Sequence, residues 1–128
     1  MTTVVDASCV VAYLLGEASD VEHGVMLDGP HAPGLVDVEA TQTFRGLLRG
    51  SKIDLATAEL GCSELAELRV RRHPDIALLR RAWELRDVCT VYDALYVALA
   101  EALDASLLTR DARLAAGAGE LIEVVVAG

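Results

Sequence analysis

The sequence lacks both an apolar run long enough to cross a membrane and the basic opening of a secretory signal. A spanning helix needs ~20 consecutive apolar residues, and no stretch here approaches that length. Residues 1–15 carry no basic side chain, and Asp6 interrupts their apolar stretch, which is contrary to the architecture of a signal peptide. We therefore expect a cytoplasmic protein without membrane contacts.

Cysteine and histidine are too scarce and too scattered to build a zinc site. Cys9, Cys62 and Cys89 form no Cys-x-x-Cys pair, and the three histidines are isolated from one another. An odd number of cysteines among small or apolar neighbours predicts buried free thiols and no disulfide framework. Any metal bound here would be held by oxygen ligands.

Basic residues are in the minority, with 11 Lys and Arg against 20 Asp and Glu and a net charge of −9. This balance argues against a whole-surface affinity for nucleic acid, because phosphate contacts need Lys and Arg. Most of the basic groups are interpreted as solvated faces. Arg110 and Arg113 differ, because they flank Asp111 where a predicted strand ends.

A chain of 128 residues, 53% of them hydrophobic, predicts one domain spanning residues 1–128 that buries a core unaided. Strands are expected at residues 2–5, 31–32, 69–72, 106–109 and 121–126. Helices are expected after Asp6, at 21–27, 35–49, 55–68, 76–86 and 92–103, and after residue 109, with 55–68 expected as a helix pair or a bent helix. This alternation is typical of an α/β fold with a parallel sheet.

The segment at residues 92–103 is apolar on nearly every face, which predicts a central helix buried on several sides. Asp93 lies in its first turn, and Thr90-x-x-Asp93 has the spacing of a capping box. Asp111 follows the next strand. In a β-α-β arrangement, helix starts and strand ends gather at one edge of the sheet. Two carboxylates are therefore expected at that edge.

Asp6 and Glu39 are expected at the same edge of the sheet. Asp6 ends the first strand, where an aspartate often serves only as a helix N-cap worth about 1 kcal/mol. Glu39 lies inside a helix at the margin of its apolar stripe, so capping does not explain it, although a solvated position is an alternative.

Together, Asp6, Glu39, Asp93 and Asp111 form a predicted acidic cluster. Two unit charges ~4 Å apart repel by about 4 kcal/mol at an intermediate dielectric, so such a cluster needs cations or protonation. Mg²⁺ and Mn²⁺ accept hard oxygen ligands, and sites of this kind suit phosphodiester hydrolysis.

Four segments resemble the PIN-domain ribonucleases, and among these the VapC toxins of bacterial toxin–antitoxin pairs. They are TVVDAS at 3–8, VDVEATQTF at 36–44, YDALYVALAE at 92–101 and LLTRDARL at 107–114. The resemblance implies a five-stranded parallel sheet of order 3-2-1-4-5 flanked by helices. It matches the acidic cluster to the family's quartet, with Ser8 and Thr109 as supporting residues, whereas Thr43 stands where the family often has Asn.

The implied activity is a Mg²⁺- or Mn²⁺-dependent endoribonuclease. Asp6 and Asp93 are expected to bind metal directly, and Glu39 and Asp111 through water or a second metal. Arg110 or Arg113 would contact RNA phosphates, or would instead pair with a surface carboxylate. The resemblance also implies a VapB antitoxin, a homodimer, and structured tRNA or ribosomal RNA as target.

Three alternatives stay open at this point. A PIN nuclease of RNA processing would act without an antitoxin, and a neighbouring small gene would separate that case from a toxin. A binding module could keep the fold without catalysis, although all four acidic positions are filled. A response-regulator receiver needs a late lysine, whereas Lys52 is the only lysine here.

Overall fold

The computed structural model describes residues 2–127, which form a five-stranded sheet with helices on both faces. The strands are β1 (Thr3–Val5), β2 (His31–Pro33), β3 (Arg71–His73), β4 (Ser106–Thr109) and β5 (Val124–Val126). The helices are α1 (Ala7–Leu14), α2 (Asp20–Leu27), α3 (Leu35–Arg49), α4 (Leu55–Leu65), α5 (Leu79–Glu84), α6 (Val91–Leu103) and α7 (Ala112–Ala118), with a 3-10 turn at Asp75–Ala77. None of these described helices is both long and apolar enough to span a membrane.

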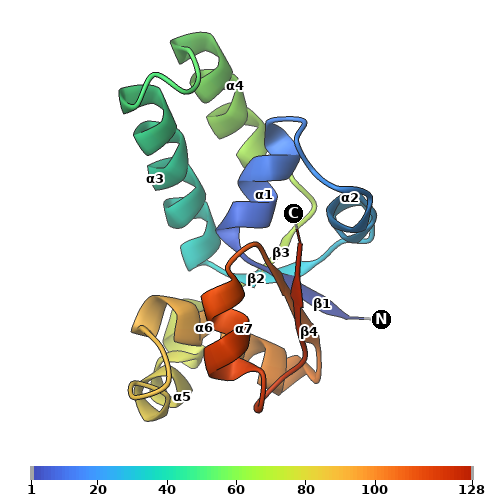
Figure 1. Cartoon of the computed structure of the whole chain (residues 1–128), viewed down its shortest axis with the longest axis vertical. Coiled ribbons are helices and arrows are strands. Elements are labelled where there is room, and N and C mark those ends of the chain that lie inside the picture. The colour runs from blue at the N-terminus through green and yellow to red at the C-terminus, as the bar shows by residue number, and fades with distance from the viewer. Residues whose placement is uncertain (1, 128) are drawn as a thin grey trace.

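All strand pairs are parallel, in the order β3-β2-β1-β4-β5, which confirms the predicted α/β fold and strand order. Figure 1 shows α1 to α4 on one side of the sheet and α5 to α7 on the other. The connections that leave β1 and β4 therefore run to opposite faces although the two strands are neighbours. Such a switch point opens a crevice at the carboxyl ends of the strands.

The core is built around β1, β4 and α6. Every residue from position 94 to 100 in α6 is buried, which confirms the predicted central helix. On the other face, α3 and α4 pack closely at Gly61, where an added Cβ would lie 2.6 Å from the Phe44 ring. Only glycine allows this approach without displacing the ring.

Several predicted boundaries shift for identifiable reasons. The helix predicted at 55–68 ends at Leu65, because the Arg72 guanidinium takes the carbonyls of Leu65 and Leu68 as acceptors. The strand predicted at 69–72 accordingly lies at Arg71–His73. The helix predicted at 76–86 is shorter in the structure, where a 3-10 turn at Asp75–Ala77 precedes α5 at Leu79–Glu84. The Asp75 carboxylate accepts from Leu35 N and so connects this turn to the start of α3.

Two further predictions need correction. The last strand is Val124–Val126 and does not begin at residue 121. Of the three cysteines predicted to be buried, only Cys9 is, whereas Cys89 is partly exposed and Cys62 is exposed. Cys62 falls on the outer side of α4, whose inner side is formed by Ala58, Gly61 and Leu65.

Candidate active site

A cavity of about 530 Å³ opens at the switch point, between α1, α3, α6 and the turn that follows β4. Its lining includes all four acidic residues singled out from the sequence, Asp6, Glu39, Asp93 and Asp111. They come from four separate segments of the chain. The structure thus brings together side chains that lie as far as 105 positions apart in the sequence.

Asp6 is fixed by the residues predicted to support it. Its carboxylate caps α1 by accepting from Cys9 N at 3.3 Å, and it accepts the Ser8 hydroxyl at 2.5 Å. The hydroxyl of Thr109, which is fully buried, donates to its second oxygen. Asp6 is therefore both the helix cap expected of an aspartate there and a carboxylate held in one orientation at the cavity.

Glu39 faces the cavity from α3 and accepts the hydroxyl of Tyr96 at 2.5 Å. Tyr96 is buried in α6, so this bond ties the two helices together. Burial raises the pKa of Glu39, and the negative charges of Asp93 and Asp6 raise it further against the opposing effect of the tyrosine hydrogen bond. Among residues 2–127, no basic side chain forms an ion pair with Glu39.

Asp93 is placed by the start of α6. Thr90 caps this helix by accepting from Asp93 N at 3.1 Å, which is one half of the predicted capping box. The reciprocal carboxylate bond is absent among the described residues, and the side chain lines the cavity instead. Burial raises the pKa of Asp93, and the charges of Asp111 and Asp6 add to this effect.

Asp111 caps α7 and has a cation partner. It accepts from Arg113 N at 2.9 Å, and the Arg113 guanidinium approaches it at 3.3 Å. These interactions lower the pKa of Asp111, with the hydrogen bond from Arg113 as the main cause. Arg113, predicted as an RNA contact, thus pairs with an acidic residue of the cluster.

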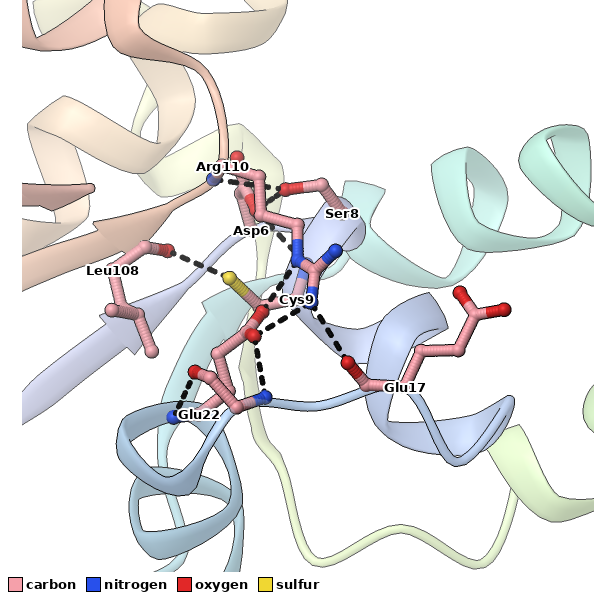
Figure 2. A network of polar contacts seen from close by, with 8 residues as sticks. Asp6, Ser8, Cys9, Glu17, Glu22, Leu108 and Arg110 are labelled. Carbon is pink, nitrogen blue, oxygen red and sulfur yellow. Dashed lines mark hydrogen bonds and ion pairs between the residues drawn. The ribbon is translucent and has the colours of Figure 1, made fainter. Parts of the chain in front are cut away.

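The Arg110 side chain extends toward Glu22 and Glu17, as Figure 2 shows, and it is not part of the cavity lining. Its guanidinium binds both carboxylate oxygens of Glu22, at 2.8 and 2.7 Å, and the carbonyl of Glu17 at 3.1 Å. Its backbone N–H donates to Ser8 Oγ at 3.2 Å. The alternative interpretation, an arginine paired with a carboxylate, therefore describes Arg110, and we assign it no phosphate contact.

Glu22 is the residue that the sequence analysis missed. Its side chain is fully buried, and Ser19 N and Glu22 complete a capping box at the start of α2. The Arg110 ion pair lowers the pKa of Glu22 to about 2. The available signal was the Ser19-x-x-Glu22 spacing, which predicts the cap but not the distant arginine. Through Arg110 and Ser8, Glu22 connects α2 to Asp6.

The chemistry of the cavity fits a divalent metal ion. All its charged donors are carboxylate oxygens, and two of them have raised pKa values that a cation would offset. Within residues 2–127, however, no three Asp, Glu, His or Cys side chains form a ready-made ligand group. The bonds to Thr109, Tyr96 and Arg113 hold the carboxylates in place. This arrangement suits an ion held by one or two carboxylates and by water.

Comparisons with known proteins agree with this geometry. A family model described as the PIN domain matches residues 3–120. Ribonuclease VapC1 of Mycobacterium tuberculosis is 39% identical over 125 residues, which cover 94% of each chain. Ribonuclease VapC9 of the same species is 38% identical over 111 residues, 87% of each chain. The crystal structure of PAE2754 from Pyrobaculum aerophilum shares the fold, with a TM-score of 0.70, 22% identity, and coverage of 97% of this chain and 83% of that one.

Proposed function

This chain belongs to the PIN-domain family and, within it, to the VapC ribonucleases, and from this we propose that it is a metal-dependent endoribonuclease acting as a toxin. We place its active site in the acidic cavity and treat residues 1–128 as one domain. The observation that carries the proposal is the meeting of Asp6, Glu39, Asp93 and Asp111 in a single cavity at the switch point. Mg²⁺ is the proposed ion, with Mn²⁺ as a substitute.

In the proposed mechanism the four carboxylates would act as two pairs. Asp6 and Asp93 would hold the ion directly, and Glu39 and Asp111 would act through water or at a second ion. Once bound, a divalent ion would supply an activated water and would offset charge on the phosphate and the leaving oxygen. Ser8 and Thr109 keep Asp6 oriented.

Glu39 and Tyr96 complete the proposed arrangement. The Tyr96 hydroxyl donates its hydrogen bond to Oε1 of Glu39. The other oxygen, Oε2, is then left to accept a proton from a water in the cavity. General-base assistance of this kind typically contributes 10²–10⁴-fold to a rate. Cleavage would leave 5′-phosphate and 3′-hydroxyl ends.

The proposed biological role has three further parts. The target is structured RNA, tRNA or ribosomal RNA, whose cleavage inhibits translation. A VapB-type antitoxin neutralises the enzyme by covering the cavity. The enzyme acts as a homodimer, in which arginines from two chains offset the net charge of −9 near the substrate. Co-expression with the product of a neighbouring small gene should then restore growth that the enzyme alone arrests.

The direct test of the activity is cleavage of total cellular RNA by purified protein with Mg²⁺, Mn²⁺ or EDTA. Discrete fragments are expected only with metal, and Asp93→Asn should lower the rate at least about 100-fold. Asp104→Asn is a matched control, because it makes the same exchange at the other end of α6, in a left-handed position that asparagine accepts. Equal cleavage by Asp93→Asn and wild type would reject the proposed site.

A further inference from the structure

We propose that Tyr92 and Arg45 bind an unpaired RNA segment across the acidic cavity, Tyr92 by stacking on a base and Arg45 by contacting a phosphate. The inference rests on the proposed nuclease function and adds to it the form in which RNA is bound. Neither residue belongs to the acidic cluster, and each lies on a different helix beside it.

Tyr92 offers an open aromatic face at the cavity. It precedes Asp93 in the first turn of α6, lines the same cavity, and is 63% exposed. Its hydroxyl has no hydrogen bond among the described residues, in contrast to the buried Tyr96. The exposed Trp83 is covered by the Arg86 guanidinium, 4.7 Å from the ring centre. Bases freed from a helix stack on exposed aromatic rings of this kind.

Arg45 is a basic side chain in a hollow that adjoins the acidic cavity. Four other arginines are engaged in ion pairs with acidic residues: Arg72, Arg81, Arg110 and Arg113. Within residues 2–127, Arg45 has no ion pair. It lines a second hollow of about 430 Å³ that shares Val38 and Gln42 with the acidic cavity. The two hollows therefore adjoin along α3.

Charge in the second hollow also favours a phosphate. Its one acidic residue, Asp37, is already bound by the Arg72 guanidinium through two nitrogens, at 3.0 and 3.2 Å. Arg45 is thus the uncompensated charge there. Arg45 lies six positions after Glu39, or about 9 Å along the helix, a length that two to three stacked nucleotides cover at ~3.4 Å each.

An unpaired segment satisfies both contacts, whereas a duplex does not. In a duplex, the faces of the bases are hidden in the stack and are not available to Tyr92. A strand that stacks one base at Tyr92 carries its phosphates over the carboxylates toward Arg45. The pair therefore selects loops, bulges or ends over helical stems.

The test measures binding of a mixed-sequence 12-nucleotide single strand, and of its duplex, to protein carrying Asp6→Asn in Mg²⁺ buffer. Tyr92→Ala should weaken single-strand binding about 5- to 150-fold, and Tyr92→Phe should retain it. Arg45→Gln should lower the slope of log affinity against log salt by about 0.7, the value of one phosphate contact on a single strand. Arg80→Gln, an exposed arginine on α5, should leave the slope unchanged.

Three results would overturn the inference. They are equal affinity of Tyr92→Ala and Tyr92→Phe, equal losses on duplex and single strand, and an unchanged salt slope for Arg45→Gln. If the wild-type enzyme cleaves RNA, any one of these results rejects only the proposed RNA-binding path. Absence of metal-dependent cleavage by the wild type rejects the proposed function itself.

Discussion

Glu22 and Glu39 are two inward-facing glutamates with opposite electrostatic environments. Glu22 is fully buried, meets Arg110 through both oxygens, and has its pKa lowered to about 2. Glu39 meets a tyrosine hydroxyl and other carboxylates, and its pKa is raised. A compensated carboxylate holds the structure together, whereas uncompensated ones at a cavity are typical of a functional site.

Removing the charge of each glutamate should therefore have opposite effects on stability. Glu22→Gln keeps the capping-box geometry but leaves Arg110 without its partner, which should lower the free energy of unfolding by about 3–5 kcal/mol. Glu39→Gln should leave this free energy equal or higher, because it removes a repelled charge. Urea denaturation in EDTA measures both.

Glu17→Gln is the matched control for Glu22, since Glu17 lies nearby and offers Arg110 only its backbone carbonyl. The double variant Glu22→Gln/Arg110→Gln should recover part of the lost stability, because the partly buried Arg110 charge is then no longer left without its partner. A Glu22→Gln variant as stable as Glu17→Gln would end the distinction between the two glutamates.

The pH dependence of stability should also distinguish Glu22 from Glu39. Because the folded pKa of Glu22 is about 2 against an ordinary 4.5, its stabilisation is full above pH 4.5 and is lost as pH falls toward 2. The loss amounts to about 3 kcal/mol. The raised pKa values of Glu39 and Asp93 act in the opposite sense, since their destabilisation decreases as pH falls through those values.

Thermal unfolding in metal-free buffers from pH 7 to pH 2 measures this profile. Glu22→Gln should lack most of the loss below pH 4.5, and Glu39→Gln should lack part of the gain that precedes it. Parallel profiles for wild type and Glu22→Gln would show that the ion pair does not set the acid stability.

The sequence predicted the acidic cluster but not the Glu22–Arg110 ion pair. Asp6, Asp93 and Asp111 follow strands or open helices, and parallel connectivity alone carries such positions to one edge. The Glu22–Arg110 pair spans 88 positions, and no local pattern specifies which arginine meets which glutamate. The strand order came from family resemblance, because short strands such as Arg71–His73 give little pattern of their own. The exposure of Cys62 depends on which side of α4 packs inward, which a weakly amphipathic helix does not reveal.

Metal binding should stabilise the protein through the carboxylates of the acidic cavity and not through the Glu22–Arg110 ion pair. At ten times its dissociation constant, an ion bound only by the folded state adds about 1.4 kcal/mol. Mg²⁺ or Mn²⁺ should therefore raise the melting temperature of the wild type and of Glu22→Gln, and EDTA should reverse the rise. Asp93→Asn should lose it, because a direct ligand is gone. An equal rise in Asp93→Asn would place the ion elsewhere.

Asp111 belongs to the acidic cluster but, like Glu22, has an arginine partner, Arg113. The Arg113 side chain is 93% exposed, so its ion pair with Asp111 should contribute less than about 1 kcal/mol to stability. Arg113→Gln should therefore change the urea midpoint little, in contrast to Arg110→Gln. The same substitution removes the main cause of the lowered pKa of Asp111 and a positive charge that competes with the metal ion. Metal affinity measured by calorimetry should consequently rise modestly in Arg113→Gln. An unchanged affinity would mean that Asp111 caps α7 and does not act on the ion.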